Sequence, residues 1–579
     1  MKRLIQHTVL LLFVLGCKND PLDITPDGRI TLADVFSDER RTEAYLNTVY
    51  SQIPSYFYKY HFNAFFATVT DEAEDGDVGN EPGVMAAQWI TGNLTPSFNP
   101  LALAGQGKGT DRYQTCWAGI RHANVFLANI GDAPVRGESF RTRMTAEARL
   151  LRAFYYLELI KFYGPLPVIS EPFSSDFEYS SLQRPSFQEI TDFIVADCDW
   201  AIASSELPVR ITLEAERGRF TKAVAHAIKS QTLLHNASAL WNGTNATEKW
   251  QAAAVAGRAA KDFLEANGYT LYPDYGDYFL RASDVNTNPQ DKETIFEIPE
   301  RPAATFVIVN SIPSMPGQYK SGACPTQELV DSYGMKETGE SPILGYEDDN
   351  HLNPIINDAS GYDPANPYVG RDPRFYHTVW YNGAEYDNIA GSIHIVETFN
   401  GGRDQLIKTP PNRKNTHTGY YLRKFMDPKL QPGHVPTAQF KKYRLAEIYL
   451  NLAEALNEVE GPVQEVYDAV NAVRARSEMP DLPAGLTKEA MRDRIRNERR
   501  VEFAFEEHRF FDVRRWKILG QTDKLITGME IRKTGESLTY HRFIVGHRSA
   551  WEDKYLLLPI PRSDAAVIPD FTANQNPGW

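Results

Sequence analysis

Cysteine is scarce in this chain. Its 579 residues include four, which lie far apart and form no Cys-x-x-Cys pair: Cys17, Cys116, Cys198 and Cys324. This spacing excludes the class of small domains held together by disulfides, and it matches no common zinc or redox motif. Cys116 and Cys198 sit beside apolar residues in helical patterns, so we expect them to be buried thiols.

Signatures of common catalytic and phosphate-binding classes are also missing. The sequence has no Gly-x-Ser-x-Gly elbow and no His-Glu-x-x-His helix. The glycine-rich stretch from Gly105 to Thr110 lacks the Lys-Ser/Thr pair and the preceding strand of a phosphate loop, which favours a flexible surface turn. The sequence leaves open whether two carboxylates are paired for glycoside hydrolysis, because the distance between them depends on the fold and acidic residues are abundant.

Positive charge is in deficit. The chain has 61 Lys and Arg against 75 Asp and Glu, a net charge of -14. Phosphate binding needs a basic face, so this balance argues against nucleic acid and against an anionic membrane surface as partners. A hydrophobic content of 42% with 23% charged residues is ordinary for globular proteins and excludes the disordered and fibrous classes. The length allows several domains or one large domain with insertions.

No apolar run is long enough for a transmembrane helix, but a short one follows Lys2 and Arg3. It covers residues 9–15, the length of a signal-peptide core, and leads into Val14-Leu15-Gly16-Cys17. This resembles a bacterial lipobox and predicts a signal peptide over residues 1–16 and lipidation of Cys17. Residues 17–30 would then be a tether, and an odd number of thiols would remain.

Helical periodicity recurs along the chain. The predicted helices are 38–52, 112–130, 142–162, 186–204, 222–241, 247–267, 438–458, 463–476 and 488–516. We expect one domain over residues 31–579, with a helical scaffold from about 31–55, 110–268 and 437–579. The segments 56–109 and 269–436 are rich in Gly, Pro, Asn and aromatic residues. Long insertions of this kind are usually functional, so we expect the ligand surface there.

The block from Glu498 to Trp516 interleaves acidic and basic side chains. Glu506 with Arg509, and Asp512 with Arg515, have helical spacing, so the block can neutralise its own charge. Aromatic residues on the same stretch would place several arginines close to the core. Buried guanidinium groups need partners, so we interpret the block as a structural ion-pair lattice and not as a ligand or catalytic site.

This block and other ordered motifs resemble the SusD/RagB family of outer-membrane nutrient-binding lipoproteins. The matching segments are 152–157, 162–167, 218–223, 237–242, 443–458, 471–476, 495–517, 555–561 and 575–579. The segment 555–561 is similar to the closing strand of the family. The family form has a proline where Ala239 stands, which puts only the local turn in doubt. The resemblance spans nearly the whole chain that follows the predicted signal peptide.

The resemblance implies a mainly α, SusD-like fold with tetratricopeptide-like helix pairs and loop-rich insertions that carry short strands. It implies a surface-exposed outer-membrane lipoprotein that captures a glycan and delivers it to a SusC-like TonB-dependent transporter. Such a protein is not an enzyme and uses no cofactor. Three alternatives stay open: peptide capture as in the RagB branch, a surface glycoside hydrolase, and a structural adhesin.

An acidic cluster runs from Asp71 to Asp77. Carboxylates in a loop are the oxygen ligands that calcium prefers, but Ala73 and Pro82 fall where ligands are required. We therefore expect an exposed acidic loop. Its carboxylates would be free to accept hydrogen bonds from sugar hydroxyls.

Flat aromatic side chains on loops are the natural candidates for stacking on a sugar ring. In the smaller insertion these are Trp89 with the neighbouring amide of Asn93, and in the larger one Trp380 and Tyr381, with Tyr319 as a further candidate. Ordinary packing within a loop is the alternative for each. The ligand residues of the family vary between members, so none is assigned by motif.

Overall fold

The computed structural model describes residues 30–57, 66–78, 85–99, 111–299, 304–387, 393–409, 412–427 and 437–579. The predicted signal peptide, Cys17 and the stretch from Gly105 to Thr110 lie outside these residues. The fold is mainly helical, with scattered short strands, which confirms the predicted fold class.

Helices account for 44% of the structure, against 11% for strands. In chain order they are α1 (Leu32–Phe36), α2 (Glu39–Tyr50), α4 (Met85–Ile90), α5 (Arg112–Asn129), α6 (Glu138–Tyr163), α7 (Phe187–Ala203), α8 (Lys222–Ala237), α9 (Thr247–Ala266), α10 (Tyr275–Tyr278), α11 (Ala304–Ile308), α12 (Gln327–Ser332), α13 (Pro373–Thr378), α14 (Leu445–Glu460), α15 (Gln464–Arg476), α16 (Lys488–Glu502), α17 (His508–Arg515), α18 (Leu519–Thr522), α19 (Arg562–Ala565) and α20 (Pro569–Ala573).

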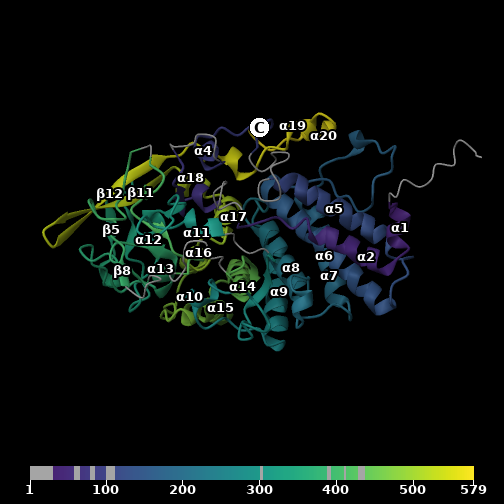
Figure 1. Ribbon diagram of the computed structural model, residues 1–579, viewed down its shortest axis with the longest axis horizontal. Helices are drawn as coiled ribbons and strands as arrows, with labels where there is room; N and C mark the ends of the chain where they lie inside the picture. Colours follow the sequence, from purple (N-terminus) through teal and green to yellow (C-terminus); the bar gives the residue numbers. More distant parts are fainter. Residues whose placement is uncertain are drawn as a thin grey trace, which may run out of the picture.

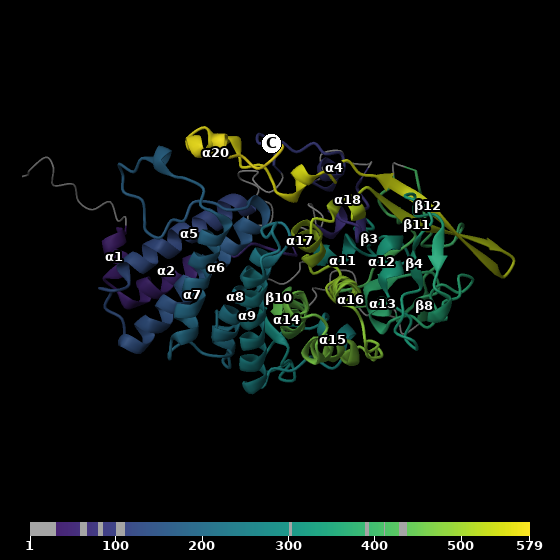
Figure 2. The ribbon, with the colours of Figure 1, turned by 180° about the vertical axis from the view of Figure 1, so that it is seen from behind.

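The long helices form an array in which each packs on the next: α5 on α6, α6 on α7, α7 on α8, α8 on α9 and α9 on α14. Figures 1 and 2 show this array in one half of the molecule. Side chains before the helices satisfy free N–H groups at their starts. Asp38 accepts from the backbone of Arg41, and Ser186 forms a capping box with Glu189.

The other half is built from loops, short helices and two-stranded antiparallel sheets. The pairs are β1 (Ala73–Asp75) with β3 (Ala323–Pro325), β2 (Thr294–Glu297) with β10 (Lys441–Arg444), β4 (Ile343–Tyr346) with β5 (Pro354–Ile356), β6 (Val379–Trp380) with β9 (Tyr421–Leu422), β7 (Glu385–Asp387) with β8 (Ile393–Ile395), and β11 (Leu525–Thr534) with β12 (Ser537–His547). The β11–β12 hairpin projects from this end of the molecule (Figure 1).

Most predicted helices are confirmed, but the C-terminal third needs three corrections. The predicted helix 438–458 begins only at Leu445, because residues 441–444 pair with β2. The β11–β12 hairpin lies within the range expected to be helical. The expected closing strand at 555–561 instead starts in a short 3-10 helix, η5 (Asp553–Leu556).

The predicted helix 488–516 is also wrong in its continuity. Helix α16 ends at Glu502 and α17 begins at His508. Between them, Phe505 and Glu507 adopt φ angles of 62° and 69°, which an α-helix does not contain. The break turns the second half of the block toward different partners from those expected for one continuous helix.

The ion-pair lattice itself is present and centres on Glu502, which has no exposed surface. Its carboxylate contacts Arg374 at 2.9 Å and Arg444 at 2.6 Å, and it also pairs with Arg476. Burial alone would raise the pKa of Glu502, but the three guanidinium groups hold it well below its usual range. Since these arginines come from α13, β10 and α15, one carboxylate joins three separate segments.

Only part of the expected pairing within the block is found. Asp512 does contact Arg515, at 2.8 Å. Glu506 instead contacts Arg444, at 2.7 Å, and Arg509 reaches Asp71, at 2.8 Å. The break after α16 separates Glu506 from Arg509, so each finds its partner elsewhere in the chain.

Buried thiols are found where they were predicted. Cys116 and Cys198 are both buried, and burial raises the pKa of each well above that of a free cysteine. Cys324, on β3, is buried too, and its pKa is raised to about 11, mainly by burial. These thiols are therefore inert core residues.

Candidate functional site

The acidic segment from Asp71 to Asp77 is not the exposed loop that we expected. Asp71, Glu72 and Asp75 are at most 3% exposed. Asp71 lies 2.8 Å from both Arg500 and Arg509. The cationic partners come from the distant C-terminal part of the chain, and they explain why so acidic a stretch is buried.

The pKa values in this segment diverge. Burial by itself would raise the pKa of Asp71, but Arg500 and Arg509 outweigh it and lower the value to about 2. Burial raises the pKa of Glu72 to about 8. Among the described residues, neither carboxylate oxygen of Glu72 has a hydrogen-bond partner. Burial therefore favours the neutral, protonated form of Glu72.

Apart from Glu72, the carboxylates that a calcium site would need lie beside basic side chains. Lys320 contacts Asp77 at 2.5 Å, and Arg548 contacts Glu74 at 3.1 Å. Within the ranges that the structure describes, no group of three His, Cys, Asp or Glu residues is placed to hold a metal ion.

The two insertions meet in this region. Strand β1, from the smaller insertion, pairs with β3 of the larger one, with Asp75 opposite Ala323. Just beyond this pairing, Asp77 accepts two hydrogen bonds from Arg413, of 2.9 and 2.7 Å. Residues far apart in sequence are thus held together, with Asp75, Asp77 and Ala323 buried.

Tyr319 lies on this cluster and is 49% exposed. Arg413 donates a hydrogen bond of 2.6 Å to the Tyr319 hydroxyl, and its guanidinium lies 4.9 Å from the centre of the ring. We call Tyr319, Arg413, Asp77 and Lys320 the Tyr319 platform. The arginine fixes the ring, which leaves an aromatic surface beside a partly exposed guanidinium group, an arrangement suited to sugar recognition. Asp77 and Lys320 are themselves buried and hold the arginine in place.

The two tryptophans predicted as sugar contacts have no exposed face in this structure. Trp89, on α4, is 1% exposed and packs edge-on against Phe510 at 5.4 Å. Trp380, on β6, is fully buried, with the Arg423 guanidinium 4.3 Å from its ring. The expectation of exposed indoles was wrong, because Trp89 belongs to the main core and Trp380 to a small separate core of the larger insertion. An indole without an open face cannot stack on a sugar unless the loops rearrange.

The other two predicted contacts differ from each other. Tyr381 follows Trp380 directly and is partly buried against Tyr368 and Phe375, with ring centres 4.9 and 5.0 Å away. Asn93 is exposed, in the turn after α4. Tyr319 is thus a predicted aromatic contact with a largely exposed ring, and its role in binding stays a prediction. The sequence did not predict its neighbours Arg413 and Lys320, because nothing in the sequence pairs residue 77 with residues 320 and 413.

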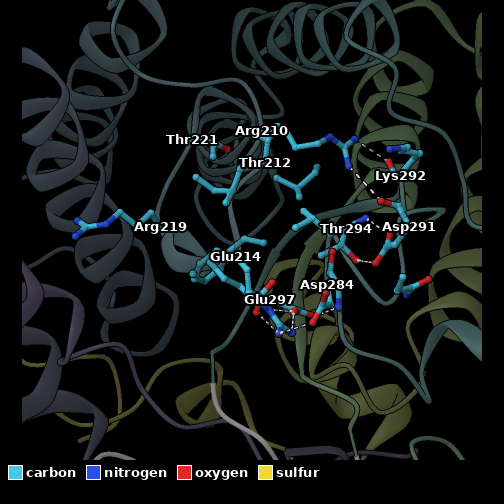
Figure 3. Close-up of a pocket in the computed structure, with 18 of the residues that line it drawn as sticks. Arg210, Thr212, Glu214, Arg219, Thr221, Asp284, Asp291, Lys292, Thr294 and Glu297 are labelled. Carbon is cyan, nitrogen blue, oxygen red and sulfur yellow. Dashed lines mark hydrogen bonds and ion pairs between the residues drawn. The ribbon is translucent and has the colours of Figure 1, made fainter. Parts of the chain in front are cut away.

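A pocket of about 250 Å³ lies between β2 and the loop that joins α7 to α8 (Figure 3). Arg210 reaches across it and donates to the carbonyl oxygens of Asp291 and Lys292, at 3.3 and 3.2 Å. Its guanidinium lies 3.6 Å from the ring centre of Tyr269. In Figure 3 the side chain of Arg219 points away from these groups.

One carboxylate of this pocket, Asp284, does not suit acid catalysis. Arg217 lies between Glu297, at 2.6 Å, and Asp284, at 3.8 Å. A backbone hydrogen bond from Thr287 is the main cause that lowers the pKa of Asp284. A glycoside hydrolase needs one carboxyl group with a raised pKa near the glycosidic bond that it cleaves. The pKa of Asp284 is lowered instead.

Within the described residues, no helix combines the length and the apolar character needed to cross a bilayer.

Comparisons with known proteins place both the N-terminal and the C-terminal half of the chain in related families. Residues 261–579 match the SusD family model, and residues 41–234 match the model described as "Starch-binding associating with outer membrane". The SusD-like protein P2 of Formosa agariphila is 22% identical over 525 residues, which cover 89% of this chain and 90% of that protein.

Solved structures share the fold. A SusD-like protein from Bacteroides fragilis superposes with a TM-score of 0.75 at 26% identity, over 94% of this chain and 98% of that one. A second B. fragilis structure, titled a SusD-like carbohydrate binding protein, gives a TM-score of 0.70 at 24% identity, over 93% and 99%. Because the SusD family model matches more than half of this chain, the chain belongs to the SusD/RagB family.

Proposed function

We propose that this chain is a cell-surface lipoprotein that captures an oligosaccharide or polysaccharide. It then passes the glycan to a SusC-like TonB-dependent transporter in the outer membrane. The family match supports a role in binding, and the related carbohydrate binding protein of B. fragilis supports a glycan as the ligand class. In this role the chain makes no covalent change to its ligand.

The observation that carries the proposal is the Tyr319 platform. It combines a half-exposed aromatic ring with a guanidinium group and a carboxylate that are already fixed by each other. A pyranose ring presents C–H groups to an aromatic face and hydroxyl groups to polar neighbours. Because the platform is held in place before binding, little ordering is required of the protein.

The first experiment is calorimetric titration of the soluble chain that begins at residue 18. The ligands are a panel of plant, host and microbial glycans and a peptide mixture, with product analysis of the same samples. Saturable glycan binding without cleavage supports capture. Peptide binding would replace the proposal with a RagB-like role in peptide uptake. Shortened products would indicate an enzyme. If neither glycan nor peptide binds, the structural adhesin is the alternative that is left.

Replacing Tyr319 with alanine is expected to weaken binding of the glycan found in this way by about 1 kcal/mol, roughly fivefold in Kd. The reason is the loss of the stacking face. Tyr319→Phe serves as the matched variant: it keeps the ring but loses the hydrogen bond from Arg413, and it should retain more of the affinity than Tyr319→Ala. Leu344→Ala, at a 69% exposed site on β4, controls for general changes in the larger insertion. Unchanged affinity in Tyr319→Ala would remove the platform from the site.

Anchoring is tested separately at Cys17. Its place at the end of the lipobox-like segment 14–17 motivates the proposal that it carries the lipid. Cys17→Ala is expected to release the protein from the membrane fraction, whereas Cys198→Ala, at a buried thiol, should leave attachment unchanged. Fractionation with mass spectrometry of the N-terminal peptide measures both. Continued attachment of Cys17→Ala would rule the anchor out.

A further inference from the structure

A second cleft, of about 480 Å³, lies on the helical scaffold among α5, α6 and α7. Arg152 of α6 holds its floor together. It donates at 2.8 Å to Asp197 of α7 and at 2.9 Å to the Asn124 side chain of α5. Phe193 forms an aromatic wall, with the Arg152 guanidinium 4.8 Å from its ring. The floor is rigid because its charged groups are paired.

Arg149 lines the same cleft and keeps hydrogen-bonding capacity. It pairs with Asp197 at 2.9 Å, and its side chain is 33% exposed. Its Nε atom is buried and has no hydrogen-bond partner among the described residues. The guanidinium also lies 5.1 Å from the ring of Trp200, which places that indole next to the cleft.

The rim of the cleft is the loop between α6 and α7, which projects from the helical array in Figures 1 and 2. Pro172 lines the cleft, and the next residue begins a cluster of three aromatic rings, Phe173, Phe177 and Tyr179. Their ring centres lie 4.1 to 5.3 Å apart. Phe173 is 36% exposed and Tyr179 is 45% exposed. Tips of ordinary loops carry small polar residues, so this cluster indicates a contact surface.

The loop is held at both of its ends. Asn124 donates to the carbonyl oxygen of Ile169 at 2.8 Å, and Arg184 donates to those of Tyr163 and Pro165 at 2.9 and 2.7 Å. The aromatic cluster is therefore presented by a fixed support.

The charges around the cleft select the class of ligand. Residues 168–183 contain no Lys or Arg but include three exposed carboxylates, at Glu171, Asp176 and Glu178. This acidic rim repels anionic glycans. The walls are helices whose backbone groups are already bonded, so an extended peptide finds no strand edge to join. Aromatic surface, carboxylate acceptors and the partly exposed guanidinium group of Arg149 instead suit the C–H faces and hydroxyl groups of a neutral sugar.

We propose that this cleft and the aromatic cluster form a second binding site, for a neutral oligosaccharide. The proposal rests on the glycan-capture function and extends it to the helical scaffold, away from the Tyr319 platform. Two sites on one rigid body hold a polysaccharide more firmly than either site alone, provided that the chain reaches both.

Trp200 provides a local readout for this site. The full chain from residue 18, labelled with 5-fluorotryptophan, is titrated with maltohexaose, xylohexaose, laminarihexaose and mannohexaose, and with hexagalacturonate as the anionic probe. The fluorine resonance of Trp200 is assigned with Trp200→Phe. We expect this resonance to shift saturably with at least one neutral hexasaccharide and not with hexagalacturonate.

Variants separate this site from the Tyr319 platform. Phe173→Ala with Tyr179→Ala should weaken the Trp200 titration roughly tenfold, because two exposed ring contacts are lost. Ser175→Ala, at an exposed position in the same loop, should not change it. Tyr319→Ala should leave the Trp200 titration unchanged while it weakens total binding measured by calorimetry.

Three results would overturn the inference. A Trp200 resonance that stays fixed while calorimetry shows glycan binding would remove the second site and leave glycan capture intact. An equal response to hexagalacturonate would contradict the selection for neutral ligands. No binding of any glycan by either method would overturn both this site and the proposed function.

Discussion

Replacing Glu502 with alanine is expected to lower the free energy of unfolding by about 3 to 5 kcal/mol. The reason is that three buried guanidinium groups, from Arg374, Arg444 and Arg476, would lose a shared carboxylate. Their side chains are at most 3% exposed, so water cannot take its place. Urea unfolding followed by circular dichroism measures the change.

Glu489→Ala is the matched control, since Glu489 lies in the first turn of the same helix and is exposed. It should change stability by no more than about 0.5 kcal/mol. A loss below about 1 kcal/mol for Glu502→Ala would mean that the remaining carboxylates, such as Glu293 beside Arg444 at 2.8 Å, compensate for its removal. That result would contradict the central place of Glu502 in the lattice.

Trp380→Ala is expected to destabilise the protein by about 3 to 5 kcal/mol, the usual result of removing a large core side chain. Trp380 belongs to a small separate core in the larger insertion with Ile312, Tyr386 and Tyr421. That core has few members, so it cannot close over the cavity left by the indole. Thermal and urea unfolding measure the loss.

Trp200→Ala, at a 36% exposed site, provides the comparison and should have a much smaller effect on stability. Binding is then measured at a temperature at which Trp380→Ala is folded. If stability is kept and glycan affinity alone is lost, Trp380 belongs to the binding site and its burial changes on binding.

Helical periodicity predicted most of the scaffold because long amphipathic segments with capping residues are determined locally. The segment 247–267 corresponds to α9, and 112–130 corresponds to α5. The hairpin of β11 and β12 was missed for a physical reason. Both faces of β11 are buried at its base, from Leu525 to Met529, so the alternation that marks a strand is absent there.

The candidate site was harder to predict because its key contacts are not local. The acidic segment has the composition of an exposed loop, and only its partners Arg500 and Arg509 make it part of the core. The sequences around Trp89 and Trp380 have the same composition as the sequence around an exposed sugar-binding aromatic residue. Burial distinguishes the two cases, and burial depends on how the two insertions pack.

The pairing of Asp71 with Arg509 has a consequence for the order of events during synthesis. The two residues are 438 positions apart, and Arg548, which donates to the carbonyl oxygen of Ala73, is 475 positions away from it. The segment 71–77 emerges from the ribosome early and can reach its native place only when the chain is almost complete. Such distant contacts slow folding and expose the unfinished core to aggregation. The charges of the early segment therefore stay in water until Arg500, Arg509 and Arg548 have been synthesised.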